Sequence, residues 1–131
     1  MKFFTLEEAI SKGVKIPLKH SGESQWGDNW KEEDYNYRLN MCDEIFYAIE
    51  GDHILGHLGV QEDTVRAVFV EDKYRGQGVA QGLYEKAFEV LGFLYSDDAR
   101  EAADTYIWEK FKKKYKNIRY LADRDQYLFK N

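Results

Sequence analysis

Hydrophobic positions in the middle of the chain follow the short period of β-strands. Apolar, β-branched and aromatic residues dominate residues 45–49, 53–60 and 65–70, and short acidic or glycine-containing turns separate these runs. Apolar side chains occur at both odd and even positions of each run, so both faces of the sheet are expected to be covered. The pattern predicts three consecutive strands with tight turns, in a sheet that has helices on both faces.

The hydrophobic period changes to that of a helix after Gly78. Val79, Leu83, Ala87 and Leu91 recur at helical spacing, and Gly92 is typical of the residue that follows a helix end. Residues 93–95 then form a short apolar run. We therefore expect a helix over 79–91 and a buried strand directly after it.

The C-terminal third predicts one more helix and a closing hairpin. Ser96, Asp97 and Asp98 are candidate N-caps. The expected helix has four apolar residues on one face, namely Ala99, Ala103, Ile107 and Phe111. Lysines crowd its C-terminal end, where they complement the helix dipole. Residues 118–121 and 127–129 flank an Asp-Arg-Asp turn and are expected to pair.

The N-terminal third is less regular. Thr5-Leu6-Glu7-Glu8 has the capping-box pattern and predicts a helix over 6–12 that stops at Gly13. Residues 19–40 are polar and aromatic, and we expect a loop plus an irregular helix that begins near Asp28. Their tryptophans and tyrosines could wall an acceptor cleft and their acidic residues could attract a cation, or they could be core residues beside a solvated helix face.

Size and charge narrow the function classes. The 131 residues suffice for one domain with a sizeable core, and the hydrophobic fraction of 44% indicates an ordered globule. A net charge of −5 makes nucleic acid an improbable partner and fits a cationic one better. No apolar run is long enough to cross a membrane, and no signal peptide is visible at the N-terminus. The single cysteine, Cys42, fits a reducing cytoplasmic compartment.

The turn between the third strand and the following helix has the features of a phosphate site. It reads Arg75-Gly76-Gln77-Gly78-Val79-Ala80. Glycines let the backbone approach a phosphate closely, and the free N–H groups and dipole of a helix start favour negative charge. A dinucleotide-binding Rossmann unit would place such a turn after its first strand. Here three strands precede the turn, which argues against that fold.

With this motif and element order, the chain resembles the GNAT (GCN5-related N-acetyltransferase) family. The motif of that family is Arg/Gln-x-x-Gly-x-Gly/Ala between a strand and a helix, and the likeness in element order extends over residues 44–129. The resemblance implies the acyl-CoA N-acyltransferase fold, an α/β fold with a mixed, mostly antiparallel central sheet flanked by helices. It implies one domain over 1–131, with an acceptor-side region at 1–43 and an acetyl-CoA-binding core at 44–131.

The resemblance also implies the donor and its site. Acetyl-CoA would bind beside the third strand, with pantetheine on the backbone of Val68, Phe69 and Val70. The pyrophosphate would rest on N–H groups of the turn, which are those of Gly76, Gln77, Gly78, Val79 and Ala80. Arg75 would shape the turn or lie near the phosphates, or it is a surface arginine. No metal is implied.

The reaction implied is direct transfer of the acetyl group to an amine of a small molecule or protein. A base must deprotonate the amine, and the nearest candidates are Glu62 and Asp63, with Glu44 a weaker one. Either carboxylate could instead be a solvated turn residue. The acid of the family is a tyrosine in the last helix, where this chain has Trp108. Tyr106 lies two residues earlier, about 200° around the helix, and could serve only if the helix enters differently.

Several alternatives stay open from sequence. His20, His53, His57 and Cys42 have no recognisable zinc spacing, and packed or edge histidines are expected. The lysine run at 110–116 is expected to be a solvated helix end, although it could approach the 3′-phosphate of CoA. A homodimer is compatible with the sequence. Because Trp108 replaces the expected tyrosine, the rival to an enzyme is a silent CoA-binding or protein-interaction module.

Overall fold

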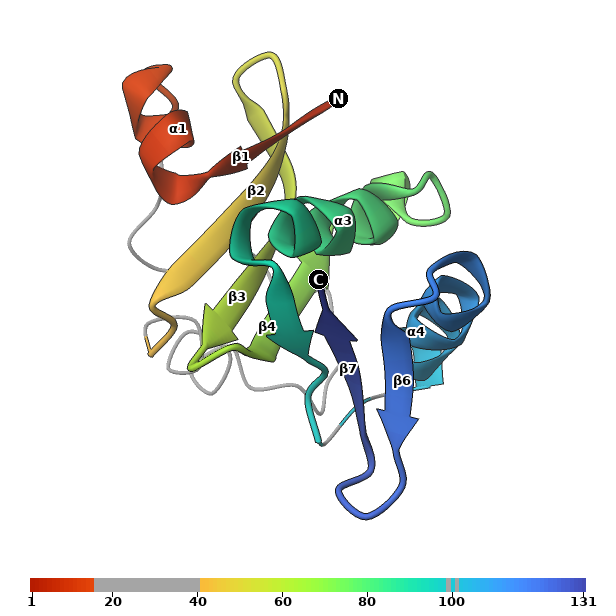
Figure 1. Ribbon diagram of the computed structural model, residues 1–131. Coiled ribbons are helices and arrows are strands. Elements are labelled where there is room, and N and C mark those ends of the chain that lie inside the picture. Colours follow the sequence, from red (N-terminus) through yellow and green to blue (C-terminus); the bar gives the residue numbers. More distant parts are fainter. Residues whose placement is uncertain (16–40, 99, 101) are drawn as a thin grey trace.

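Seven strands form one sheet in the described part of the chain, and helices lie on both of its faces (Figure 1). The computed structural model describes residues 1–15, 41–98, 100 and 102–131. The predicted loop and irregular helix at 19–40, with its candidate acceptor cleft, and His20 lie outside the described residues. The strand order across the sheet is β1-β2-β3-β4-β5-β7-β6.

The three central strands are those that the hydrophobic pattern predicts. They are β2 (Glu44–Glu50), β3 (His53–Gln61) and β4 (Thr64–Val70), each antiparallel to the next. Glu62 and Asp63 make the β3–β4 turn with φ values of 49° and 66°, which is the left-handed backbone that a two-residue hairpin turn requires. The mixed, mostly antiparallel sheet expected from the sequence is confirmed.

The N-terminus adds a strand that the sequence did not predict. Strand β1 (Lys2–Thr5) pairs antiparallel with β2 at the edge of the sheet. Directly after it, α1 (Leu6–Ser11) begins with the expected capping box. The Thr5 hydroxyl accepts from the Glu8 amide at 3.2 Å, and the Glu8 carboxylate accepts from the Thr5 amide at 2.9 Å. Thr5 therefore both ends the strand and caps the helix.

The C-terminal half has the predicted order of elements. Helix α3 (Val79–Leu91) ends at Gly92 with φ of 69°, and β5 (Phe93–Tyr95) follows. Helix α4 (Ala102–Lys114) leads to the hairpin of β6 (Ile118–Leu121) and β7 (Gln126–Lys130), which is confirmed.

Two details of α4 differ from the prediction. The helix begins at Ala102, so the serine and aspartates at 96–98 precede it and do not cap it; the buried Ser96 hydroxyl instead accepts from the Tyr127 amide at 2.8 Å. The buried residues of α4 are Trp108 and Phe111, whereas Ala103 is exposed. Of the predicted face, Phe111 is in the core and Ile107 packs against it, while Ala99 lies outside the described residues. Trp108 is the buried residue that the prediction left out, and burying its ring removes far more apolar surface from water than burying an alanine.

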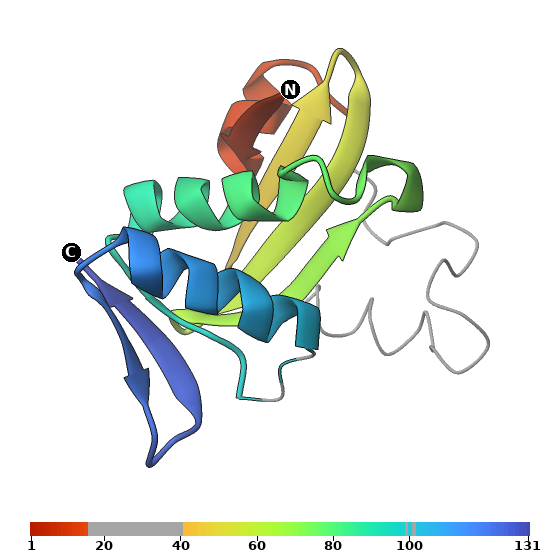
Figure 2. The same cartoon turned by 90° about the vertical axis from the view of Figure 1, so that its right-hand side faces the viewer.

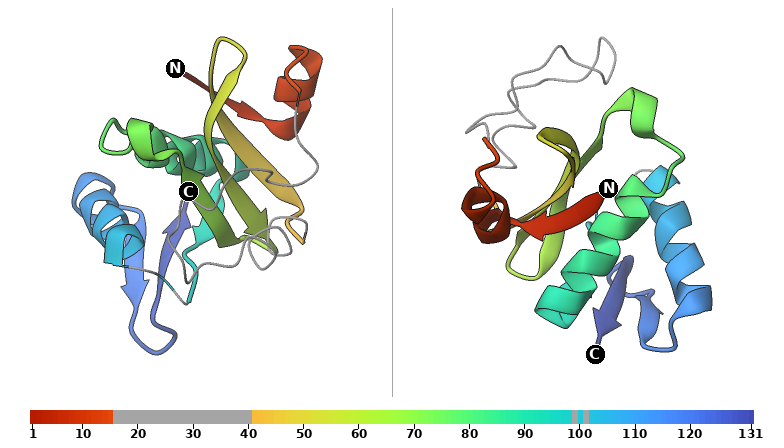
Figure 3. Two further views of the ribbon diagram at one scale, coloured as in Figure 1. Left: turned by 180° about the vertical axis from the view of Figure 1, so that it is seen from behind. Right: turned by 90° about the horizontal axis from the view of Figure 1, so that it is seen from above.

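The main core lies between the sheet and the pair α3 and α4, which run side by side over one face (Figure 2). Aromatic rings dominate it: Phe88 stacks on Phe129 with ring centroids 4.2 Å apart. Helix α1 covers the opposite face of β2, where Ala9 packs against Tyr47 and Ile49 (Figure 3). None of the helices within the described ranges is both long and apolar enough to cross a membrane.

The sheet is splayed between β4 and β5, the one parallel pair among the strands that the structure describes. Their only register pair is Thr64 with Tyr95, and the Tyr95 amide donates to the Asp63 carbonyl at 2.7 Å. Beyond that point β4 continues to Val70, whereas β5 ends. The second half of β4 thus has no strand partner on this side among the described residues.

Candidate functional site

A cavity of about 570 Å³ lies beside the half of β4 that extends beyond its pairing with β5. Its walls come from three elements: β4, the segment from the end of β4 into α3, and one face of α4. The lining residues are Val68, Val70, Tyr74, Arg75, Gly76, Gly78, Val79, Ala80, Gln81, Ala103, Asp104, Ile107 and Lys110. The volume is in the range of small-molecule and cofactor sites.

Backbone N–H groups at the start of α3 form one end of this cavity. The first N–H to bond within the helix is that of Gly82, which donates to the Gly78 carbonyl at 3.0 Å. The preceding N–H groups, those of Val79, Ala80 and Gln81, therefore have no carbonyl acceptor inside the helix. With the helix dipole, they make this end of the cavity attractive to an anion.

The turn before α3 depends on two glycines. Gly76 and Gly78 have φ values of 77° and 83°, a conformation that other residues rarely adopt. A Cβ at either position would meet nothing within 4 Å, so the space in front of both is open. The turn is therefore shaped by backbone conformation and leaves room for a bulky group.

Arg75 has a structural role in this turn as well as a place in the cavity wall. Its Nε donates to the Val70 carbonyl at 3.3 Å, and its Nη1 lies 3.1 Å from the Asp72 carboxylate. The side chain is about half exposed, at 49%. Arg75 thus ties the end of β4 to the turn and is also one of the residues that line the cavity.

The structure brings together most of the residues that the sequence assigns to the cofactor. All of them line the cavity except Phe69 and Gln77. The Phe69 side chain is buried on the other face of the sheet, with its ring centroid 5.4 Å from that of His57. The Gln77 side chain turns back to donate to the Lys73 carbonyl at 3.1 Å.

The predicted carboxylate bases lie outside the cavity lining. Glu62 and Asp63 are exposed in the β3–β4 turn, at the end of β4 where β5 still pairs with it. The Glu62 amide donates to the Asp43 carboxylate at 3.3 Å. Glu44 is exposed at the start of β2, at the same end of the sheet. The cavity begins several residues further along β4, at Val68.

Neither candidate for the acid of the last helix lines the cavity. Tyr106 is 66% exposed, and the Lys110 ammonium lies 5.6 Å from the centroid of its ring. Trp108 is fully buried, where it stacks on Tyr127 and meets the edge of Tyr84 at centroid distances of 5.8 and 5.4 Å. The tryptophan at the expected tyrosine position is a core residue.

Sequence reasoning missed the side of α4 that faces the cavity. Ala103, Asp104, Ile107 and Lys110 line it. Ala103 and Ile107 belong to the apolar face predicted from the sequence, whereas Asp104 and Lys110 on the same side of the helix were not identified as site residues. Asp104 also lies near the Tyr84 hydroxyl. Burial, and next the Asp104 carboxylate, raises the pKa of Tyr84 well above its usual value.

Two arginines hold the segment that follows β5. Arg66 occupies a β-bulge in β4, because the register shifts between the pairs Gly59–Ala67 and Val60–Val65. Its guanidinium lies 3.5 Å from the carboxylates of Asp97 and Asp98 in the segment after β5. Arg100 has a side chain only 7% exposed and lies 2.9 Å from the Asp125 carboxylate, which ties this segment to the β6–β7 hairpin.

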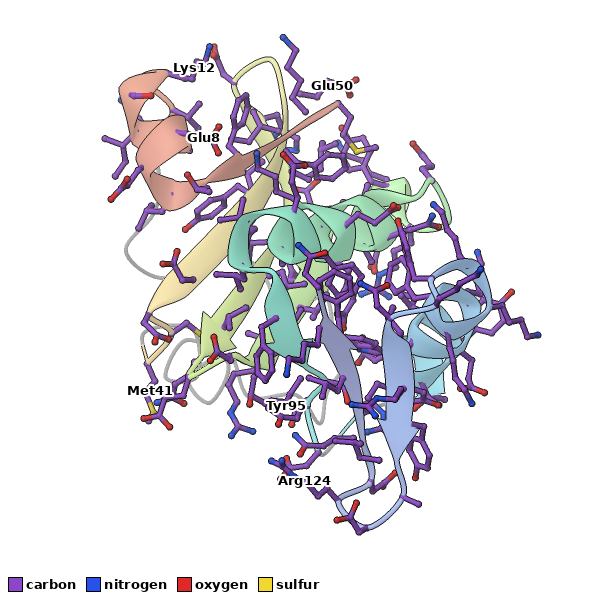
Figure 4. The ribbon with its side chains drawn as sticks, in the orientation of Figure 1. Glu8, Lys12, Met41, Glu50, Tyr95 and Arg124 are labelled. Atoms are coloured by element: carbon purple, nitrogen blue, oxygen red, sulfur yellow. The ribbon has the colours of Figure 1, made fainter. Side chains whose placement is uncertain are left out.

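The end of the sheet at which these segments lie also carries Met41, Tyr95 and Arg124 (Figure 4). The Arg124 guanidinium packs over the Tyr95 ring, 4.6 Å from its centroid. The carboxylates of the β3–β4 turn are at this end too. Several chain segments with charged side chains thus converge where β4 and β5 separate.

The other side chains considered as candidates, two histidines and the cysteine, lie outside the cavity lining. His57 is buried with its ring centroid 6.2 Å from that of Tyr47, as expected of a packed histidine, and His53 is an edge residue whose Nε2 lies 3.0 Å from the Glu71 carboxylate. Cys42 is half-buried and forms no disulfide. Among the described residues, no group of His, Cys, Asp and Glu side chains is arranged to hold a metal ion.

Comparison with protein families gives one clear result. Residues 16–95, more than half of the 131-residue chain, match the acetyltransferase (GNAT) family. The match includes β2, β3, β4, α3 and β5, and with them the glycine turn. No curated protein matches the sequence closely enough to be counted as a relative.

Solved structures show the same fold at low sequence identity. The ribosomal-protein-S18-alanine N-acetyltransferase of Escherichia coli is similar with a TM-score of 0.53 at 15% identity, over 97% of this chain and 88% of that one. The putative N-acetyl transferase YhhK of E. coli, solved bound to coenzyme A, has a TM-score of 0.53 at 15% identity, over 99% and 98% of the two chains. At this identity the likeness extends to the fold.

Proposed function

The chain belongs to the GNAT family of acetyltransferases, and from this premise we propose that it transfers the acetyl group of acetyl-CoA to an amine. The observation that carries the proposal is the cavity between the start of α3 and the half of β4 that extends beyond its pairing with β5. One end of it offers free N–H groups, and its length runs beside a strand edge. A long cofactor with a pyrophosphate and an amide-containing arm has groups that suit both features.

In the proposed complex, the pyrophosphate binds the N–H groups from Gly76 to Ala80. The pantetheine arm lies along β4, where its amides replace the strand partner that the splay removes, beside the backbone of Val68, Phe69 and Val70. Arg75 and Lys110 add positive charge to the cavity wall. This arrangement places the thioester toward the point where β4 and β5 meet.

An amine is the acceptor class that the charge around this point supports. Asp97 and Asp98 after β5 are ion-paired with Arg66, but Glu62 and Asp63 in the β3–β4 turn are exposed carboxylates at that end of the sheet. Such carboxylates attract an ammonium group to the mouth of the site. Glu62 and Asp63 stay candidates for the base that deprotonates it, through water because they lie outside the cavity.

A second candidate is a CoA-binding or protein-interaction module without transfer activity. The observation that favours it is the burial of Trp108 in the core, since no tyrosine of α4 lines the cavity. Such a module would bind CoA through the same cavity. It would release no free thiol from acetyl-CoA in the presence of amines.

The test incubates the protein with acetyl-CoA and three amine probes: spermidine, a tetrapeptide with one lysine, and a tetrapeptide with a free α-amino group. Free CoA thiol and acetylated product are measured, and CoA binding is followed by calorimetry. Amine-dependent thiol release supports the transferase. Saturable CoA binding with no acetylated probe supports the module, and absence of CoA binding would contradict both.

A further inference from the structure

A single carboxylate lines the cavity in the part of the chain that the structure describes, and it belongs to Asp104. The other charged lining residues, Arg75 and Lys110, are cationic and share the cavity with the N-terminus of α3. The phosphates of CoA bind best near these positive groups and worst near a carboxylate. Asp104 is therefore expected to lie beside the uncharged arm of the cofactor, the part that carries the thioester.

A buried hydroxyl, that of Tyr84, lies near Asp104 where α3 and α4 meet. Tyr84 is 1% exposed, and its hydroxyl lies close enough to the Asp104 carboxylate for that charge to raise the pKa of the phenol after burial has done so. Trp108 lies one helical turn after Asp104 and is fully buried, and its Nε1 has no hydrogen-bond partner within the described ranges. Of these three side chains, Tyr84 and Trp108 are buried in the core, and Asp104 is the one that lines the cavity.

We propose that Asp104 is a catalytic residue that carries a proton from the attacking nitrogen to the leaving sulfur, with Tyr84 as its positioning residue. This role rests on the proposed acetyl transfer. A neutral amine forms the N–C bond, and the Asp104 carboxylate takes the N–H proton of the resulting ammonium. The C–S bond breaks with its electron pair on sulfur, and the protonated Asp104 gives that proton to the thiolate. Nitrogen and sulfur are bonded to the same carbon, so one carboxylate can contact both.

The proposed relay supplies a proton donor for the leaving sulfur, a group that could not be identified from the sequence. Trp108 cannot donate to the sulfur from the core, and Tyr106 is exposed outside the cavity. Asp104 is also an acidic residue in the first turn of α4, where it stabilises the helix through the dipole. A test must therefore measure something that a stabilising role alone leaves unchanged.

The experiment compares the wild type with Asp104→Asn, Asp104→Glu, Asp104→Ala and Tyr84→Phe, using the probe amine that the wild type acetylates fastest. Glu89→Gln is the matched control, because it removes an exposed carboxylate from the C-terminal half of α3, outside the cavity lining. The measurements are kcat, KM for acetyl-CoA, CoA affinity by calorimetry, and the midpoint of thermal unfolding. Formate is added to Asp104→Ala as a small replacement carboxylate.

Loss of a proton-transfer group lowers rates by about 10²–10⁴-fold, so Asp104→Asn is expected to lose at least ~100-fold in kcat while keeping its affinity for CoA. Asp104→Glu and formate with Asp104→Ala should each recover part of the rate, Tyr84→Phe should lower kcat without changing KM, and Glu89→Gln should match the wild type.

Three results would overturn the relay. The first is an unchanged kcat in Asp104→Asn, and the second is a kcat loss matched by an equal loss of CoA affinity. The third is inactivity that neither glutamate nor formate relieves. If the wild type itself acetylates no probe, the proposed function fails and the relay fails with it. An active wild type with an equally active Asp104→Asn refutes the relay alone.

Discussion

Replacing Gly78 by alanine and by tryptophan separates backbone strain from occlusion of the proposed pyrophosphate site. Gly78 has a φ of 83°, and a Cβ there would meet nothing within 4 Å. Both side chains therefore incur the same left-handed strain, which costs about 1–2 kcal/mol, and neither Cβ collides with the protein. We expect the free energy of unfolding to fall by that amount in both variants.

The affinities for CoA should differ between the two. Alanine leaves the space in front of the turn open, so its effect is limited to the strain, at most about 30-fold in Kd if the whole of about 2 kcal/mol acted on binding. Tryptophan fills the space that the phosphates would occupy. If two hydrogen bonds to the charged pyrophosphate are lost at about 1.5–3 kcal/mol each, the Kd should rise by more than ~100-fold.

Calorimetry with CoA and urea unfolding measure the two effects on the same samples. Gly13 supplies the matched control, since it has a φ of 78° and open space within 4 Å but lies in the turn after α1. Gly13→Ala and Gly13→Trp should show the same loss of stability and no change in CoA affinity. Equal Kd values for Gly78→Ala and Gly78→Trp would refute the assignment of the open space to the pyrophosphate.

Three further predictions concern packing and pH. Gly82→Ala should lower the free energy of unfolding in urea by about 1–3 kcal/mol, since its Cβ would collide with the Phe3 ring. Adding Phe3→Ala should relieve part of this loss, and strictly additive losses in the double variant would contradict the collision. Trp108→Tyr should lower the free energy of unfolding by about 1–3 kcal/mol, because the smaller ring leaves a void in the core. It should form free CoA from acetyl-CoA no faster than the wild type, and a higher rate of acetyl transfer would contradict the place of residue 108 in the core. Burial raises the pKa of Glu85, but hydrogen bonds, led by the one from Tyr115, outweigh burial, and the net pKa is lowered. The stability that this carboxylate adds is therefore present above its unfolded pKa and is lost as the pH falls through its folded pKa. The unfolding free energies of wild type and Tyr115→Phe should therefore differ more at neutral pH than in acid, and a pH-independent difference would count against the bond.

The hydrophobic period was a reliable guide where local and tertiary preferences agree. The strands β2, β3 and β4 alternate around tight turns, and α3 has its apolar stripe between two glycines in the left-handed conformation. These features are determined by residues that are close together in the sequence. The glycine turn belongs to the same class, because its backbone shape and its chemistry come from one short segment.

Features that depend on distant residues could not be predicted in the same way. Strand β1 has only four residues and needs β2 as a partner, so its own pattern carries little signal. The burial of Trp108 in α4 was not predicted because it depends on contacts with the aromatic rings of Tyr84 in α3 and Tyr127 in β7. The orientation of α4 also brings Asp104 into the cavity lining, which depends on how the helix packs and could not be predicted from the sequence.

The splay between β4 and β5 has a consequence for how the protein unfolds. Each of the other pairs of neighbouring strands is joined over several residues, whereas β4 and β5 share a single register pair. A bound cofactor arm would act as a surrogate strand that couples the hairpins on either side. Amide hydrogens of residues 67–70 should therefore exchange more slowly with CoA bound, and the two sides of the sheet should unfold more cooperatively when it is present.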